Sequence, residues 1–295
     1  MLASHSAIYS HPEPHLITPL YYLGYYATVD RAPYDHVNAA QALRELTEEL
    51  PRGEADYLDA LRAYTDTLYG RVLGPTGKGY FLDKTPAYAL VLPFLAKLYP
   101  DAKYVVLTRH PFAVMHSVAH SFFGGDYAAA EAANPIVARY VPAIGRFLLD
   151  APVPYVHVRY EDLVQAPETQ MRRILDHIGV RFEPAVVDYG SKRHMSKSYG
   201  DPVSVEKHRR PVTDSMITWA QDLSANAEAL ALAQRAARRL EDAHLQAWGY
   251  PRPALLEPLG SVLPQRTHRA RLDTYQVKRQ VLLTLRKNVH DTALG

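Results

Sequence analysis

The sequence contains no cysteine at all, which excludes disulfides and thiolate metal or redox sites and is compatible with a reducing compartment. A bias toward one charge is also missing, since 33 basic residues stand against 31 acidic ones. This balance predicts neither nucleic acid nor a membrane surface as a partner. No apolar run approaches the roughly 20 residues that span a bilayer, and the first residues show no signal-peptide pattern. We therefore expect a soluble, cytoplasmic protein.

Alternating apolar strands and helical stretches predict an α/β fold with a parallel sheet. The 47% of hydrophobic residues suffice for a sizeable core. Helical periodicity and helix-start prolines predict helices at 54–73, 86–99, 111–123, 135–149, 167–178 and 225–247.

The tail after residue 250 differs in character from the rest of the chain. Its prolines predict an extended connector, and residues 277–289 predict a basic amphipathic helix, so the expected domains are 1–250 and 251–295. This helix is expected to dock on its own domain. A homodimer contact or an acidic carrier protein is the alternative partner.

The most informative segment runs from Tyr104 to Ser117. An apolar run through Leu107 predicts a buried strand, and Pro111 then suits the first position of a helix, where its missing N–H costs nothing. Arg109 would stand beside that helix N-terminus, where orphan N–H groups, the helix dipole and the planar guanidinium all favour a phosphate. Ser117 could add a hydroxyl. A surface ion pair of Arg109 is the alternative, because short motifs recur by chance.

Two further predicted strands end in polar residues. One ends in Lys84, and the other is followed by Tyr160, Glu161 and Asp162. Because the carboxyl ends of strands form the ligand crevice of an open α/β sheet, we expect Lys84 and Tyr160 at a binding site. Glu161 and Asp162 are interpreted as acids at the favourable end of a helix.

Over residues 4–219 these segments resemble the nucleotide-binding core of sulfotransferases that use 3′-phosphoadenosine-5′-phosphosulfate (PAPS), particularly the tyrosylprotein and the bacterial or polyketide-associated branches. The resemblance implies a three-layer, P-loop-like parallel sheet flanked by helices. It implies transfer of a sulfuryl group from PAPS to a small-molecule or carrier-bound hydroxyl, with the bisphosphate PAP as product. In that family the 3′-phosphate is held at the positions of Arg109 and Ser117, and the adenine lies near Tyr160. A basic loop closes over the nucleotide, and its candidates here are Lys207, Arg209 and Arg210.

The resemblance also implies catalytic residues. Lys84 would reach the leaving side of the sulfuryl group, and Glu13 would be the acid that serves as general base, with His15 and His11 as runners-up. Prolines on both sides of Glu13 predict an extended, exposed carboxylate.

The family begins with a strand and a Gly/Ser-rich 5′-phosphosulfate loop, whereas Met1 resembles the end of the helix that follows them. The first strand and loop are therefore expected to be missing from this sequence. Either the native polypeptide starts further upstream, which we favour, or this short form does not bind PAPS normally and its activity is impaired. The segment at 74–79 does not replace that loop, because Gly79 stands where a P-loop needs Ser or Thr, so a turn is predicted there.

Two other functions stay open. The first is a nucleotide-binding or scaffold protein that kept the core and lost catalysis. The second is a P-loop kinase, which the lack of a Walker A motif disfavours. The 14 histidines are interpreted as having no metal-ligand spacing, so no metal site is expected.

Overall fold

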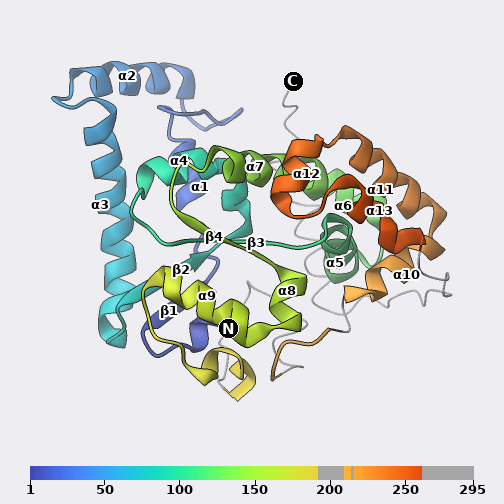
Figure 1. Ribbon diagram of the computed structural model, residues 1–295. Helices are drawn as coiled ribbons and strands as arrows, with labels where there is room; N and C mark the ends of the chain where they lie inside the picture. Colours follow the sequence, from blue (N-terminus) through green and yellow to red (C-terminus); the bar gives the residue numbers. More distant parts are fainter. Residues whose placement is uncertain (192–208, 214–215, 261–295) are drawn as a thin grey trace. The chain divides into compact units, whose positions relative to one another are not determined.

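The computed structural model describes residues 1–191, 209–213 and 216–260, which divide into two compact units (Figure 1). Unit 1 consists of Met1–Tyr104, Pro152–Val156 and the described part of Glu168–Arg210. Unit 2 consists of Val105–Ala151, His157–Pro167 and the described residues from Pro211 onward. In the part of the chain that the structure describes, no helix has the length and apolar character needed to cross a membrane.

Unit 1 is built on two parallel strands, β1 (Ile8–Pro12) and β2 (Tyr80–Lys84), which pair in a register that sets Pro12 opposite Lys84. Its helical elements, with 3₁₀ turns marked η, are η1 (Leu2–Ser4), α1 (Ile17–Tyr21), α2 (His36–Glu49), α3 (Glu54–Leu73), η2 (Gly74–Thr76), η3 (Pro86–Val91), α4 (Leu92–Leu98), η4 (Pro184–Val186) and η5 (Tyr189–Ser191). Helix α9 (Pro167–Ile178) belongs to this unit from Glu168 onward. The register brings the carboxyl ends of both strands to one edge.

The core of unit 1 combines aliphatic side chains with the aromatic rings of Tyr57, Tyr88 and Phe94. Helix α3 contributes Tyr57 and Leu61, which lie on one helix face because four residues separate them. Phe94 of α4 packs 4.8 Å, centroid to centroid, from the ring of Tyr26. This cluster fixes α3 and α4 to each other within unit 1.

Two further strands, β3 (Tyr104–Thr108) and β4 (Tyr155–Arg159), form a second two-stranded sheet. Each leads into a helix. Strand β3 continues through Arg109 and His110 into α5 (Pro111–Phe123), and β4 is followed at once by α8 (Tyr160–Gln165). The predicted strand–turn–helix units are therefore present.

Helices make up most of unit 2. Besides α5 and α8, its described helices are α6 (Tyr127–Ala133), α7 (Ile136–Asp150), α10 (Thr218–Ala225), α11 (Ala227–Arg239), α12 (Asp242–Trp248) and α13 (Arg252–Gly260). Phe112 and Met115 of α5 pack in one core with Trp219 and Leu223 of α10. Helices α7 and α12 approach closely at Gly145, where an added Cβ would lie 2.8 Å from Cβ of His244.

The sequence-based fold prediction is confirmed in class and in several boundaries. The structure is α/β, the predicted helices at 54–73, 111–123 and 167–178 are α3, α5 and α9, and the segment at 74–79 is a turn in which Gly77 has a φ of +66°. The four described strands form two small sheets rather than one continuous sheet.

Three predictions about helices were wrong. The predicted helix at 86–99 begins as the 3₁₀ turn η3, because Pro93 cannot donate into a continuous α-helical ladder. The predicted helix at 225–247 is broken at Asn226, whose side chain caps α11, and at the extended residue Leu240. The expected extended connector after residue 250 is instead helix α13, held by the fully buried Leu255. The predicted helix at 277–289 lies outside the described residues.

Candidate active site

Glu13 and Lys84 form an ion pair at the ends of the parallel strands of unit 1. The ammonium Nζ of Lys84 lies 2.7 Å from Oε1 of Glu13. The carboxylate is the more sheltered partner, with 17% of its side chain exposed against 59% for Lys84. Nε2 of His15 lies 3.7 Å from Oε2 of Glu13, beyond hydrogen-bond distance. The three residues predicted to be catalytic are therefore neighbours.

The expected extended, exposed presentation of Glu13 was wrong. Its φ is +34° and that of His15 is +53°, both in the left-handed region that residues other than glycine seldom occupy. A residue before proline prefers the extended region, so Glu13 adopts its left-handed conformation against the local preference, and the chain turns at Glu13 and His15 instead of continuing β1. Such residues cost of order 1–3 kcal/mol each and cluster at functional sites, where the surrounding structure holds them.

Asp83, which the sequence-based prediction did not use, organises the end of β2. Its carboxylate accepts hydrogen bonds from the hydroxyls of Tyr69 at 2.5 Å, Thr85 at 2.9 Å and Tyr88 at 3.0 Å. Burial, together with the hydrogen bond to Asp83, raises the pKa of Tyr69, which stays a donor. Because successive strand residues point to opposite faces, this network holds β2 while leaving Lys84 on the other face to meet Glu13. Because Tyr69 lies on α3 and Asp83 on β2, no local sequence signal predicts the contact between them.

In unit 2 the structure brings Arg109 and Tyr160 together. The guanidinium carbon of Arg109 lies 4.5 Å from the centroid of the Tyr160 ring, a cation–π contact. The backbone carbonyl of Arg109 accepts a hydrogen bond from Nε1 of Trp248 at 2.9 Å. These contacts hold the residue at the junction between β3 and α5, beside the residue that follows β4.

Two N–H groups at the start of α5 already have partners within the chain. The N–H of Phe112 donates to Nδ1 of His110 at 3.3 Å, and the N–H of His110 donates to Oε1 of Glu161 at 3.2 Å. The other carboxylate oxygen of Glu161 accepts from the Tyr250 hydroxyl. Burial raises the pKa of Glu161 and lowers that of His110 to about 4. Both N–H groups are therefore engaged within the chain, and Arg109 stays the residue predicted to bind an anion here.

The structure describes three of the other predicted nucleotide-binding residues, which are Ser117, Arg209 and Arg210. Ser117 is half-buried in α5, about 9 Å along the axis from Pro111 at a rise of about 1.5 Å per residue. Within unit 1 the backbone carbonyl of Arg209 accepts a hydrogen bond from the backbone N–H of Gly190. Nη2 of Arg210 lies 3.7 Å from Oε1 of Glu168, and this ion pair is exposed. Lys207 lies outside the described residues.

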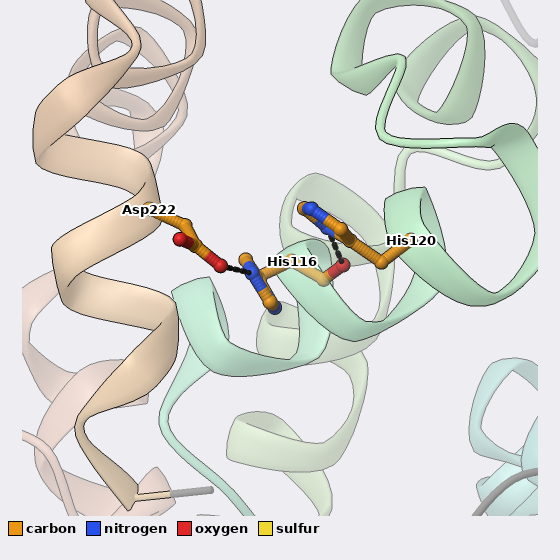
Figure 2. A group of neighbouring side chains, drawn as sticks. All are labelled: His116, His120 and Asp222. Carbon is orange, nitrogen blue, oxygen red and sulfur yellow. Dashed lines mark hydrogen bonds and ion pairs between the residues drawn. The ribbon is translucent and has the colours of Figure 1, made fainter. Parts of the chain in front are cut away.

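One cluster of possible metal ligands, on α5 and α10, lies outside the residues predicted from the sequence. His116 and His120 have the His-x3-His spacing, so the expectation that the histidines lack metal-ligand spacing was wrong. Both imidazoles lie on α5, and Nε2 of His116 is 2.8 Å from Oδ2 of Asp222 on α10 (Figure 2). The ligand atoms of the three residues lie within 4.8 Å of one another.

These features define an α/β protein with two polar sites at strand ends: an acid–lysine pair in unit 1, and an arginine beside a proline-initiated helix in unit 2. The model of the Sulfotransferase family matches residues 1–184, more than half of the chain. The chain therefore belongs to the sulfotransferase family.

Individual relatives agree with this assignment. Nodulation protein NoeE of Sinorhizobium fredii is 26% identical over 76% of this chain and 59% of its own length. Omega-hydroxy-beta-dihydromenaquinone-9 sulfotransferase Stf3 of Mycobacterium bovis is 29% identical over 33% of this chain and 28% of its own length. The chain thus spans less than two thirds of either relative. The solved sulfotransferase domain of the Synechococcus PCC 7002 olefin synthase covers 89% of both chains at 25% identity, with a TM-score of 0.52.

Proposed function

We propose that this chain transfers a sulfuryl group from PAPS to a hydroxyl acceptor and releases PAP. The observation that carries the proposal is the contact between Glu13 and Lys84 at the ends of two parallel strands, in a chain of the sulfotransferase family. A carboxylate and an ammonium 2.7 Å apart are the base and the cation that transfer to a hydroxyl requires. The structural likeness to a sulfotransferase domain over 89% of the chain supports the same activity.

Glu13 acts as the general base, and Lys84 stabilises the leaving group. When bound, PAPS supplies an activated sulfuryl group with a phosphate leaving oxygen in line with the attacking hydroxyl. Glu13 takes the proton of that hydroxyl. An ammonium has three N–H donors, so Lys84 can hold Glu13 with one and the leaving oxygen with another. Nε2 of His15 lies 3.7 Å from Oε2 of Glu13, and His15 would assist that proton transfer.

Arg109, Ser117 and Tyr160 hold the nucleotide. The planar guanidinium of Arg109 can donate two parallel hydrogen bonds to one phosphate. Arg109 binds the 3′-phosphate, the group that distinguishes PAP from other adenine nucleotides. Tyr160 lies under the guanidinium, so its ring both orients Arg109 and offers an aromatic surface to the adenine. Lys207, Arg209 and Arg210 would close over the phosphates. Arg210 pairs with the exposed Glu168, which a phosphate can replace as its partner.

The acceptor class follows from the relatives. One is named for a substrate with an omega-hydroxyl group, and another is a domain of an olefin synthase, so a small-molecule or carrier-bound alcohol is the acceptor class we propose. A cytoplasmic location and a homodimer remain predictions of the sequence.

The test is acceptor-dependent release of PAP. The purified chain is incubated with PAPS and a panel of primary alcohols, phenols and phosphopantetheine-linked hydroxyls, and PAP and sulfated products are measured by mass spectrometry. We expect PAP and sulfated product in equal amounts with at least one acceptor class. Binding of PAP without any transfer would favour a nucleotide-binding or scaffold role, and phosphorylation of acceptors by ATP and Mg²⁺ would indicate a kinase.

A further inference from the structure

His116, His120 and Asp222 form a compact group of potential metal ligands within unit 2. Figure 2 shows the two imidazoles side by side on α5 and the carboxylate reaching toward them from α10. All three side chains are partly buried, and their ligand atoms lie within 4.8 Å of one another. None of the three has a role in the transfer of the sulfuryl group proposed above.

The packing of unit 2 holds the three residues in place. Side chains four residues apart lie on the same face of a helix, and the rings of His116 and His120 stack with their centroids 4.0 Å apart. Asp222 is flanked on α10 by the buried Leu223, which packs in the same core as Met115 of α5. A site built on two packed helices holds its ligands more firmly than a site on loops.

A hydrogen bond to the backbone orients the ring of His120 as a metal ligand requires. Nδ1 of His120 lies 3.1 Å from the backbone carbonyl of His116, so this nitrogen carries the proton and the neutral ring keeps its lone pair on Nε2. An imidazole N–H donated to a backbone carbonyl is the usual outer contact of a metal-bound histidine.

We propose that His116, His120 and Asp222 bind a divalent transition-metal ion, with Zn²⁺ the best fit. Two imidazoles and one carboxylate are a typical ligand set for Zn²⁺, and bonds of about 2.0–2.1 Å place tetrahedral ligand atoms about 3.3 Å apart. The 2.8 Å contact between His116 and Asp222 would open by roughly half an ångström, as the cation replaces the proton between them. The ion would fasten α5 to α10.

The aromatic ring of Tyr127 lies beside the site. The ring of Tyr127 packs 5.7 Å from that of His120 and 6.2 Å from that of His116, centroid to centroid. Its side chain is buried, and among the described residues its hydroxyl has no hydrogen-bond partner. A buried hydroxyl is costly unless another group bonds to it, and a water on the metal would be such a group. The charge of Arg109, which also acts on His116, opposes a cation, so we expect moderate affinity.

The test is calorimetric titration of the full chain, stripped with a chelator, with zinc chloride. We expect saturable binding that weakens at least tenfold in the His120→Ala variant and in the nearly isosteric Asp222→Asn variant. Co²⁺, added in place of Zn²⁺, should give visible absorption bands of a tetrahedral site that both variants lose. Circular dichroism confirms that each variant is folded, and Asp222→Asn keeps the shape of the side chain if His120→Ala is unstable.

His36→Ala on α2 and Asp176→Asn on α9 are the controls, because they remove the same chemical groups outside the cluster. They should bind Zn²⁺ as the unmodified chain does. Equal Zn²⁺ affinity of the unmodified chain, His120→Ala and Asp222→Asn would overturn the proposal, as would the absence of Zn²⁺ binding by the unmodified chain. Because the readout is metal binding and not sulfate transfer, its result is independent of the proposed function.

Discussion

Nζ of Lys84 lies 2.7 Å from Oε1 of Glu13, although 71 positions separate the two residues in the chain. The pairing of β1 with β2 causes this contact, since its register sets Pro12 opposite Lys84 and Glu13 follows directly. The left-handed turn at Glu13 then directs the carboxylate toward the ammonium. The proposed base and the proposed cation are thus held together by backbone geometry before any substrate binds.

The Glu13→Gln substitution should abolish most of the transfer activity. The amide keeps the size of the side chain and removes the base, so kcat should fall by about 10²–10⁴-fold, as for other general bases. The affinity for PAP, measured by calorimetry, should change by less than about twofold. Glu48→Gln, an exposed change on α2, is the control and should leave kcat unaltered. If the Glu13→Gln chain kept more than a tenth of the activity, Glu13 would not be the base.

Replacing Arg109 with alanine should weaken PAP binding. A hydrogen bond to a charged group contributes about 1.5–3 kcal/mol, which corresponds to a loss of roughly 10- to 150-fold in affinity. Arg109→Lys should also bind poorly, because an ammonium lacks the bidentate fork. Arg235→Ala, which removes an exposed arginine from α11 of the same unit, is the matched control. Equal affinities for Arg109→Ala and Arg235→Ala would remove Arg109 from the nucleotide site.

Two glycine-to-alanine changes in helices should have opposite effects on stability. At Gly145 the new Cβ would lie 2.8 Å from Cβ and 2.9 Å from Cα of His244, so the contact between α7 and α12 must shift, at a cost of about 1–3 kcal/mol. At Gly70, near the end of α3, nothing lies within 4 Å, and alanine should stabilise the helix by about 0.5–1 kcal/mol. Urea unfolding measures both changes, and a stabilised Gly145→Ala chain would contradict the close packing.

Acid should destabilise unit 2 through His110. Burial lowers its pKa from an ordinary value of 6.5 to about 4, so the unfolded chain binds this proton more readily than the folded chain. Stability is therefore lost as the pH falls from 6.5 to 4, by up to about 3 kcal/mol from this group alone.

The difference between the unmodified chain and His110→Asn isolates this effect. Asparagine retains a cap for the N–H of Phe112 and does not titrate. The pKa of Glu161 is raised by burial, so Glu161 acts in the opposite direction in both chains. Urea unfolding at pH 7 and pH 4.5 should show a smaller loss of stability for the variant. The same loss in both chains would show that His110 does not titrate on unfolding.

The strand–turn–helix units could be predicted because their signals are local. Pro111 sets the start of α5, and Gly179, with a φ of +90°, follows the end of α9. The contact of Arg109 with Tyr160 was not predicted, since the two residues lie on different strand–helix units. The His-x3-His spacing was visible in the sequence and was overlooked.

Features that depend on distant residues could not be predicted. The carboxylate of Asp83 is held by Tyr69 from α3, and the N–H of His110 is taken by Glu161 from α8, so both depend on how helices pack. The left-handed conformation of Glu13 is sustained by the surrounding fold against the local preference of a residue before proline. Local propensity does not contain these contacts, because tertiary packing decides them.

Calorimetric titration of the unmodified chain with PAP, and separately with adenosine 5′-monophosphate and with ATP and Mg²⁺, tests the central claim most directly. The 3′-phosphate distinguishes PAP from the other two nucleotides, and it is the group assigned to Arg109. PAP should bind at least tenfold more tightly than either competitor. Equal affinity for all three, or tighter binding of ATP with Mg²⁺, would contradict the assignment of this chain to sulfuryl transfer from PAPS.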